Sequence, residues 1–172
     1  MSNVVAGVVR GQYPYLEEHI AQKKAIYERY RDGFKDLPVQ MNQWCNVMRW
    51  EKSTSPFLRT SEFLWQEGHT AHETHDDAVE ETIRMLNVYY DFMVNVLSIP
   101  VIRGGKSDSE RFAGAEATYT CEALMHDGKA LQMGTSHFLS DHFARAYDIK
   151  YLSREGKQEY CFTTSWGTST RM

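Results

Sequence analysis

The stretch that decides the fold is Arg49-Trp50-Glu51-Lys52-Ser53-Thr54-Ser55-Pro56-Phe57-Leu58-Arg59-Thr60-Ser61-Glu62-Phe63. It joins two runs rich in aromatic residues, 39–51 and 57–67, through the polar segment 52–56, which contains a proline. Aromatic runs bounded by such a segment are typical of strands, and the serines and proline between them favour a loop. We therefore predict two antiparallel strands joined by a loop.

The alternation of side chains along a strand predicts what each of its faces presents. In the first run, Arg49 and Glu51 share a face. In the second run, one face would hold Phe57, Arg59, Ser61, Phe63, Trp65 and Glu67. A guanidinium holds phosphate oxygens with a rigid fork of donors, and an aromatic ring stacks on a nucleobase with about 1–3 kcal/mol. Such a face suits the floor of a site for a flat, charged ligand.

A helix is predicted after these strands. Thr74 is placed to cap it, and Asp76 and Asp77 lie in the first turn, where the helix dipole favours acidic residues. The helix ends before Pro100. The apolar stripe that we expect to enter the core is Val79, Ile83, Leu86, Tyr90 and Val94.

The rest of the chain is mainly extended in pattern. The predicted strands are 101–103, 115–125, 130–135, 150–152 and 159–166, with a turn at Asp127-Gly128 and a short helix over 138–147. Another helix is predicted in the lead segment 1–35, from near Pro14 to near Gly33. Antiparallel strands with helices set apart predict an α+β domain.

Composition limits the class of protein. The 172 residues are 42% hydrophobic and 24% charged, as expected for one globular domain. A net charge of −4 excludes nucleic-acid binding by bulk attraction, so any RNA contact must come from a local patch. Three widely spaced cysteines suit a reducing compartment. No apolar run is long enough to span a membrane, and the start does not resemble a signal peptide, so we expect a cytoplasmic protein.

The pattern Arg49-x-Glu51, loop, Arg59-x-x-x-Phe63 resembles the second signature motif of class II aminoacyl-tRNA synthetases. The run 56–72, Pro-Phe-Leu-Arg-Thr-Ser-Glu-Phe-Leu-Trp-Gln-Glu-Gly-His-Thr-Ala-His, is similar to the prolyl-tRNA synthetase family in particular. The resemblance continues in the same order at Leu37-Pro38, Asn42-Gln43-Trp44-Cys45-Asn46, Phe112-Ala113-Gly114, Gln132-Met133-Gly134-Thr135-Ser136-His137 and Thr164-Ser165-Trp166-Gly167.

This resemblance implies the organisation of the chain. Residues 36–172 would form part of a class II synthetase catalytic fold, an antiparallel β-sheet with flanking helices, and residues 1–35 remain unassigned. The third motif, with an arginine that clamps the γ-phosphate side of ATP, would lie beyond Met172, and we expect nothing in the chain to replace it. The family's Thr-x-Glu loop for the proline nitrogen and its anticodon-binding domain are not recognised either.

The resemblance also implies a role for each matching residue. The catalytic set would be Arg49, Glu51 and Arg59, with Arg49 at the α-phosphate and the proline carboxylate and Arg59 at the outer phosphates. The ATP-binding residues would be Arg49, Arg59, Thr60, Glu62, Phe63, Gln132, Thr135 and Thr164, with Phe63 stacked on adenine. The proline-binding residues would be Arg49, Trp65, Glu67, His69, His137 and Ser165.

The implied reaction has two steps. Proline and ATP, the latter with Mg²⁺ as a substrate complex, would give prolyl-adenylate, and the 3′ end of tRNA(Pro) would then take the prolyl group. The family is homodimeric. The alternatives are a synthetase-like module that senses proline or a nucleotide without aminoacylation, and an amide-forming ligase that uses the adenylate on another acceptor.

Two other patterns have simpler interpretations. His69, His72 and His75 stand at three-residue spacing, as in some metal sites, but no cysteine accompanies them. We interpret them as structural or substrate-pocket residues and expect no metal bound by the protein. The segment 104–107, Gly-Gly-Lys-Ser, lacks the spacing of a phosphate-binding loop and is predicted to be a surface loop.

Overall fold

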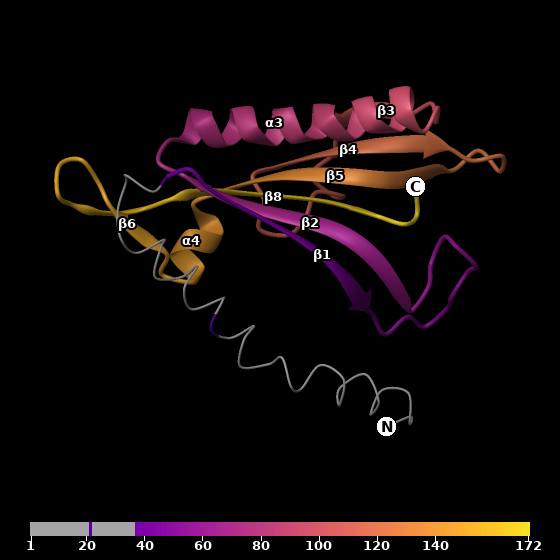
Figure 1. The fold of residues 1–172 in the computed structure, drawn as a ribbon, viewed down its shortest axis with the longest axis horizontal. Coiled ribbons are helices and arrows are strands. Elements are labelled where there is room, and N and C mark those ends of the chain that lie inside the picture. The colour runs from indigo at the N-terminus through magenta and orange to yellow at the C-terminus, as the bar shows by residue number, and fades with distance from the viewer. Residues whose placement is uncertain (1–20, 22–36) are drawn as a thin grey trace.

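A computed structural model describes residues 37–172 together with Ala21. Among these residues, six strands form one antiparallel sheet in the order β1-β2-β8-β5-β4-β3, and β6 and β7 form a separate ribbon (Figure 1). The prediction of an α+β fold, with an antiparallel sheet and flanking helices, is confirmed. The helix predicted between residues 14 and 33 lies outside the described residues, apart from Ala21, which is helical.

The elements of the described residues have these bounds. The large sheet contains β1 (Val39–Met48), β2 (Glu62–His72), β3 (Ile102–Gly105), β4 (Ala117–Leu124), β5 (Ala130–Ser140) and β8 (Phe162–Ser169). The ribbon contains β6 (Lys150–Leu152) and β7 (Gln158–Tyr160). The helices are α3 (His75–Asp91), the π-helix η3 (Phe92–Val96) and α4 (His142–Ala146). None of these helices is long and apolar enough to cross a membrane.

The β1–β2 hairpin confirms the predicted antiparallel pair, but its loop is longer than predicted. The strands end at Met48 and restart at Glu62, and the backbone between them folds into a tight turn bridged between Ser55 and Arg59. Phe57 occupies the left-handed region at φ 61° and is largely exposed. Phe57 and Arg59 are therefore not strand residues, and the predicted shared face is correct only from Phe63 onward.

Helix α3 begins and ends as predicted. The Thr74 side chain accepts a hydrogen bond from the Asp77 backbone N–H, and the helical segment stops before Pro100. The predicted core stripe is displaced. Leu86 is the one predicted member that is buried, and Tyr89 and Met93 are buried in place of Tyr90 and Val94.

The displacement has a cause in the sheet below the helix. Gly134 of β5 has no side chain, and a Cβ there would lie 3.1 Å from the Met93 Cε and 3.2 Å from the Tyr89 Cδ2. The two large side chains pack onto this glycine, and Ser136 donates a hydrogen bond of 2.8 Å to the Thr82 carbonyl. The small residues of β5 thus set which face of α3 is buried.

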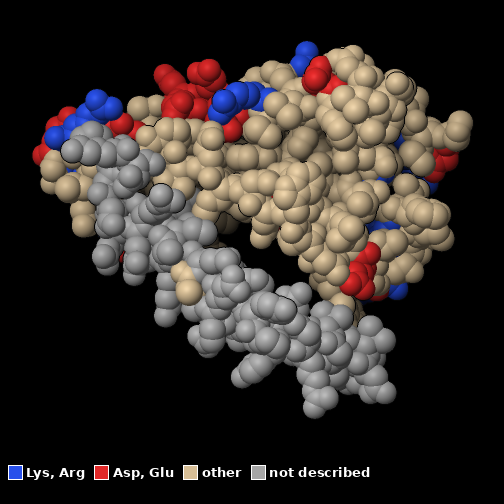
Figure 2. All heavy atoms as spheres, viewed as in Figure 1, with Lys and Arg blue, Asp and Glu red and all other residues tan. Residues whose placement is uncertain are grey.

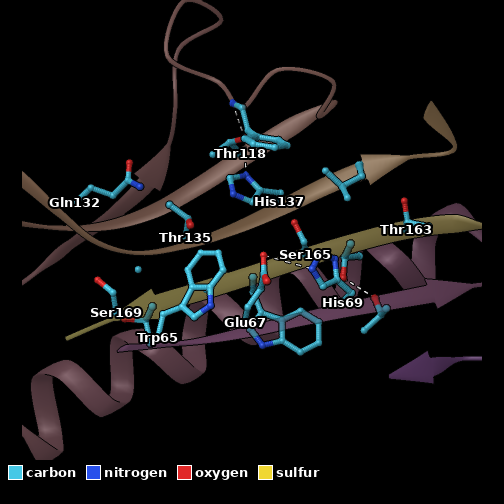
Figure 3. Close-up of a pocket in the computed structure, with 18 of the residues that line it drawn as sticks. Trp65, Glu67, His69, Thr118, Gln132, Thr135, His137, Thr163, Ser165 and Ser169 are labelled. Atoms are coloured by element: carbon cyan, nitrogen blue, oxygen red, sulfur yellow. Dashed lines mark hydrogen bonds and ion pairs between the residues drawn. The ribbon is translucent and has the colours of Figure 1, made fainter. Parts of the chain in front are cut away.

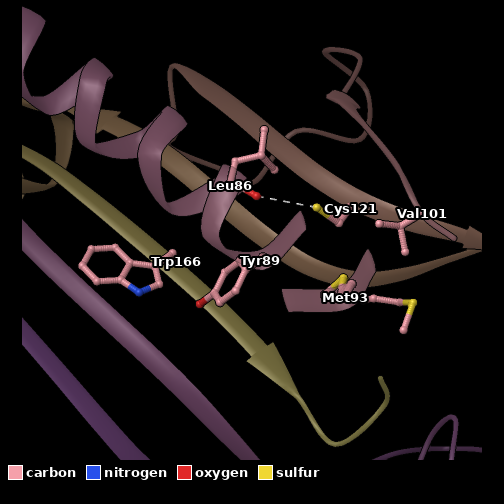
Figure 4. Packing of buried hydrophobic residues seen from close by; sticks show 7 residues of the cluster. Leu86, Tyr89, Met93, Val101, Cys121 and Trp166 are labelled. Atoms are coloured by element: carbon pink, nitrogen blue, oxygen red, sulfur yellow. Dashed lines mark hydrogen bonds between the residues drawn. The ribbon is translucent and has the colours of Figure 1, made fainter. Parts of the chain in front are cut away.

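The main hydrophobic core lies between α3 and the sheet (Figure 4). Its buried members are Leu86, Tyr89, Met93, Val101, Cys121, Met133 and Trp166. Full burial of a side chain of this size contributes about 1.5–3 kcal/mol. Trp166 lies across Gly68 of β2, where an added Cβ would lie 2.2 Å from the indole. The core therefore depends on a bare backbone at Gly68.

Three other predictions need correction. Gly104 and Gly105 end strand β3 rather than belonging to a surface loop. The helix predicted over 138–147 is confined to α4, because Phe138 and Ser140 continue β5 in register with β8. The strand predicted over 159–166 is divided into β7 and β8 at Cys161, which is buried in a second small cluster. The turn at Asp127-Gly128 is confirmed, with Gly128 at φ 80°.

Charged side chains of both signs are interspersed on the face shown in Figure 2. Lys and Arg stand beside Asp and Glu along the edge formed by α3, and no single basic area is visible there. The view agrees with the low net charge of −4. On this face, therefore, the charged side chains do not form one large surface of a single sign.

Candidate active site

A pocket of about 730 Å³ lies on the face of the large sheet opposite α3 (Figure 3). Its floor is made of side chains from neighbouring strands that stand directly opposite one another. One row runs His69, Ser165, His137 and Thr118 across β2, β8, β5 and β4. Opposite residues of an antiparallel pair share a face, so the pairing register alone brings these four side chains together.

The next row contains a gap in the floor. Glu67, Gly167 and Thr135 stand opposite one another on β2, β8 and β5. A Cβ at Gly167 would meet only the Gln66 carbonyl oxygen, at 3.4 Å, so the sheet does not require the glycine for packing. Its missing side chain instead leaves room above the middle strand, between a carboxylate and a hydroxyl.

One end of the pocket combines a cation with aromatic rings. Arg49 follows the end of β1, and its backbone N–H donates to the Ser61 carbonyl at 2.8 Å. The guanidinium carbon lies 5.2 Å from the Phe63 ring centroid and 5.7 Å from that of Trp65. Cations at these distances are attracted to the ring faces. The aromatic pair therefore holds Arg49 at the edge of the pocket.

Two more arginines stand nearby. Arg59 forms an ion pair of 3.1 Å with Glu51, and both line a second hollow that adjoins the pocket. Arg171 lines both hollows, and its Nε donates to the Leu58 carbonyl at 2.8 Å. Burial lowers the pKa of Arg171, and the like charges of Arg59 and Arg49 lower it further. Three guanidinium groups close enough to repel one another are suited to a multiply charged anion.

The opposite end of the pocket carries two histidines and a carboxylate. His69 Nε2 lies 3.4 Å from Glu67 Oε1. Burial, followed by the effect of His69, lowers the pKa of His137 from 6.5 to about 4. His137 is therefore a neutral ring at pH 7, with one nitrogen able to donate and one able to accept.

This lowered pKa predicts a pH dependence of stability. The unfolded chain binds a proton at His137 near pH 6.5, whereas the folded chain binds it only near about pH 4. The free energy of unfolding should therefore fall as the pH falls through this window. Denaturant unfolding at about pH 7 and about pH 5 measures the loss, and His137→Gln should reduce it. A parallel fall in both proteins would contradict the assignment.

The structure gathers most of the predicted site residues in this pocket. Its lining includes Arg49, Phe63, Trp65, Glu67, His69, Gln132, Thr135, His137, Thr164 and Ser165. Glu51 and Arg59 line the adjoining hollow instead.

The side chains of three predicted residues do not face the pocket. Thr60 and Glu62 are not among the lining residues of either hollow; the Thr60 hydroxyl donates to the Glu62 carbonyl at 2.8 Å, and the Glu62 carboxylate accepts from Asn46. Thr164 borders the pocket, but its hydroxyl bonds to that of Thr70 on the side of α3. Any contact of Thr164 with a ligand is therefore through its backbone.

Sequence reasoning missed several lining residues. Arg171 is the first of them, because the sequence was expected to hold no replacement for the arginine of the third motif. The structure places Arg171 beside Arg49 and Arg59. Its position just after the end of β8 was the available signal, since Arg49 likewise follows the end of a strand. Lys106 and Thr118 carried no local signal, because they reach the site only through the pairing of β3 with β4 and of β4 with β5.

The three closely spaced histidines point in different directions. His69 faces the pocket, whereas His72 is buried on the side of α3 and contacts Thr70 and Asp77. His75 stands against the rings of Phe138 and Phe162. In the described part of the chain, no group of three or more His, Cys, Asp or Glu side chains is arranged to hold a metal ion.

Comparisons with known proteins agree with this geometry. The model of the tRNA synthetase class II core domain (G, H, P, S and T) matches residues 19–172. The proline–tRNA ligase of Lachnoclostridium phytofermentans is 54% identical over 175 residues, covering 98% of this chain and 37% of that protein. The proline–tRNA ligase of Alkaliphilus oremlandii is 59% identical over 175 residues, covering 98% of this chain and 36% of that protein. The chain thus spans little more than a third of the length of these relatives.

Solved structures extend the likeness to the fold. A crystal structure of prolyl-tRNA synthetase from Cryptosporidium parvum, complexed with L-proline and AMP, superposes with a TM-score of 0.81 at 39% identity, covering 85% of this chain and 32% of that one. A second structure of that enzyme, complexed with halofuginone and AMPPNP, gives the same TM-score of 0.81 and covers 30% of the enzyme. The resemblance found in the sequence is confirmed. The chain therefore belongs to the family of class II tRNA synthetase core domains, and it resembles those members that are proline–tRNA ligases.

Proposed function

We propose that this chain carries the ATP- and proline-binding site of a proline–tRNA ligase that acts in the cytoplasm. The observation that carries the proposal is the division of one pocket into two ends. Arg49, which lies over Trp65, and Arg171, which follows β8, stand at one end, while His69 and His137 stand at the other, with Gly167 between them in the register of the strands. Relatives with similar sequences are proline–tRNA ligases, and a similar structure holds L-proline and AMP.

The cationic end would bind ATP as its Mg²⁺ complex. Arg49 would contact the α-phosphate, Arg59 and Arg171 the outer phosphates, and Phe63 would stack on adenine. Arg59 would have to exchange its partner Glu51 for phosphate, which their exposed ion pair allows at little cost. Gln132 and Thr135 would lie on the nucleotide side.

The other end would bind proline. The Trp65 ring, which lies beside Arg49, would supply an apolar wall where the two ends meet, and the Glu67 carboxylate would supply a counter-charge for the secondary ammonium of proline. His69, His137 and Ser165, which stand in one row, would contact the rest of the amino acid. The carboxylate of proline would then point along the floor toward Arg49.

The chemistry follows from this placement. A carboxylate oxygen of proline attacks the α-phosphorus of ATP, the bond to the bridging oxygen breaks, and magnesium pyrophosphate leaves. A terminal hydroxyl of tRNA(Pro) then attacks the prolyl carbonyl and releases AMP. No side chain need act as a nucleophile, because the site aligns the two substrates and its guanidinium groups stabilise charge on the phosphate.

The proposed organisation extends beyond the pocket. Residues 36–172 would form part of the catalytic domain, and residues 1–35 would precede it. The whole protein would act as a homodimer, as its family does. The sheet provides the floor of the substrate site, and other parts of the whole protein would contact the tRNA.

Proline-dependent exchange of pyrophosphate into ATP tests the proposal directly. The chain is assayed with proline, then with each of the other amino acids, alongside calorimetric titration with proline and with AMP. Exchange that requires proline supports adenylate formation. Binding of proline or AMP without exchange would overturn the proposal in favour of a sensing module. Exchange followed by transfer to a small amine but not to tRNA would indicate an amide-forming ligase.

Arg171 offers a more local test. We expect Arg171→Ala to raise the KM for ATP roughly 10-fold or more, since a charge-assisted hydrogen bond contributes about 1.5–3 kcal/mol. The KM for proline should change much less. Arg145→Ala is the control, because Arg145 pairs with Asp141 and lies over Tyr160, outside both hollows. Equal effects of the two substitutions on ATP would refute the phosphate role of Arg171.

A further inference from the structure

The Thr118 hydroxyl occupies a buried position between the pocket and the segment that follows β3. Thr118 is only 4% exposed and lies on β4 opposite His137 of β5. Its Oγ1 lies 3.2 Å from the Phe112 backbone nitrogen and 2.9 Å from Nδ1 of His137 (Figure 3). Among the described residues these are the two hydrogen-bond partners of the hydroxyl.

Counting donors assigns the direction of both hydrogen bonds. A threonine hydroxyl has one proton and two lone pairs, and a backbone N–H can only donate. Phe112 therefore donates to Thr118 Oγ1. If Nδ1 of His137 also donated, the Thr118 proton would be buried without an acceptor, which costs about 1–3 kcal/mol. The Thr118 O–H therefore donates to Nδ1.

This direction fixes the tautomer of His137. The ring is neutral at pH 7, because burial and the neighbouring His69 lower its pKa to about 4. A neutral imidazole carries one proton, and Nδ1 is occupied as an acceptor. The proton must therefore be on Nε2. Since the two ring nitrogens diverge, Nε2–H is directed away from Thr118 and toward the pocket that His137 lines.

The same threonine holds the segment that borders this end of the pocket. Its carbonyl accepts a hydrogen bond of 2.8 Å from the Lys106 N–H, while its hydroxyl holds the Phe112 N–H. The Phe112 ring then lies 4.8 Å from the His137 ring, at an interplanar angle of 38°. The position of Phe112 over the histidine and the protonation pattern of the ring therefore depend on one residue.

We propose that Thr118 is a positioning residue that holds His137 as the neutral Nε2–H tautomer, so that the pocket offers an uncharged N–H donor to a substrate oxygen. The identity of that oxygen, the proline carboxylate or the carbonyl of the acyl-adenylate, rests on the proposed function. An uncharged donor orients a carboxylate without neutralising it, and so preserves its negative charge for attack on phosphorus. The other tautomer would direct a lone pair at the same oxygen and repel it.

The tautomer can be measured without any ligand. In ¹⁵N-histidine-labelled protein, two-bond proton–nitrogen correlations distinguish the protonated from the unprotonated ring nitrogen, and the spectrum of His137→Gln assigns the His137 signals. We expect a protonated Nε2 and an unprotonated Nδ1 in the wild type. Thr118→Val should move both nitrogens toward averaged shifts, whereas Thr118→Ser, which keeps the hydroxyl, should restore the wild-type pattern.

Thr120→Val is the matched control. Thr120 lies two residues along the same strand, is similarly buried and donates its hydroxyl to the Gly134 carbonyl at 3.2 Å, away from His137. It should leave the His137 signals unchanged. A protonated Nδ1 in the wild type, or an unchanged His137 pattern in Thr118→Val, would overturn the proposal. A loss of pattern in Thr118→Ser or Thr120→Val equal to that in Thr118→Val would assign the effect to packing and would also overturn it.

A second readout concerns the ligand. In the exchange assay we expect Thr118→Val to raise the KM for proline about 10-fold, with the KM for ATP unchanged within about 2-fold, because only the amino-acid end loses a hydrogen bond. Thr118→Ser should recover most of the loss. If the wild-type chain shows no proline-dependent exchange, the proposed function fails, while the tautomer measurement still decides the role of Thr118.

Discussion

Replacing Arg49 with alanine should lower proline-dependent ATP–pyrophosphate exchange by about 100-fold or more. Removing a single preorganised group that stabilises transition-state charge costs 10²–10³ in kcat in comparable sites. Arg49 is held over Phe63 and Trp65, so it is oriented before any substrate binds. Because it would contact both the α-phosphate and the proline carboxylate, kcat and kcat/KM should fall together.

The control for this substitution is Arg103→Ala. Arg103 also lies over an aromatic ring, 4.3 Å from the Tyr90 centroid, and its guanidinium donates to the Asn87 side chain. It does not line the pocket. Removal of its cation–π contact therefore reproduces the packing change without touching the site. Normal exchange by Arg49→Ala, or equal losses in both variants, would show that the site is assigned incorrectly.

Gly68→Ala should cause the largest loss of stability among single-methyl additions in the sheet. The new Cβ would lie 2.2 Å from Cε2 and 2.3 Å from Cζ2 of Trp166, far inside van der Waals contact. Trp166 is 6% exposed and packs against α3, so its indole cannot move aside freely. Overpacking of this kind costs about 3 kcal/mol, which lowers the Tm of a domain of this size by roughly 6–12 °C.

Thermal unfolding followed by circular dichroism measures the effect. Gly104→Ala is the matched control, because Gly104 is also a strand residue and an added Cβ there would meet nothing within 4 Å. Its Tm should stay within about 2 °C of the wild type. A Gly68→Ala protein that unfolds at the wild-type temperature would mean that Trp166 does not lie across this glycine.

The parts of the fold that could be predicted are those with local causes. The Thr74 cap, the acidic first turn of α3 and the Asp127-Gly128 turn depend on neighbouring residues, and all three are present. The β1–β2 hairpin was predicted for the same reason. The ends of its strands were predicted less accurately. The polar segment 52–56 indicated a loop, but the tight turn between Ser55 and Arg59 makes the loop longer than that segment.

The parts that could not be predicted depend on contacts between distant segments. The buried face of α3 is set by Gly134, and the end of β5 at Ser140 is set by its pairing with β8. The role of Thr118 depends on a register between β4 and β5 that no local pattern specifies. Site residues that belong to a family motif, such as His137, could be predicted without knowledge of these pairings. The motif identifies them because all members of a family share the fold that brings them together.

Alternate residues of strand β2 line the pocket on one face of the sheet and pack the core on the other. The side chains of Trp65, Glu67 and His69 face the pocket, whereas Gly68 packs against Trp166 and the Thr70 hydroxyl bonds to that of Thr164 on the side of α3. The lining of the pocket and the packing of the core therefore depend on interleaved positions of one short peptide. A laboratory library that varies only 65, 67 and 69 can change the lining of the pocket while the core keeps its wild-type sequence. A deletion of one residue in this strand, by contrast, would exchange the two faces and remove both properties together.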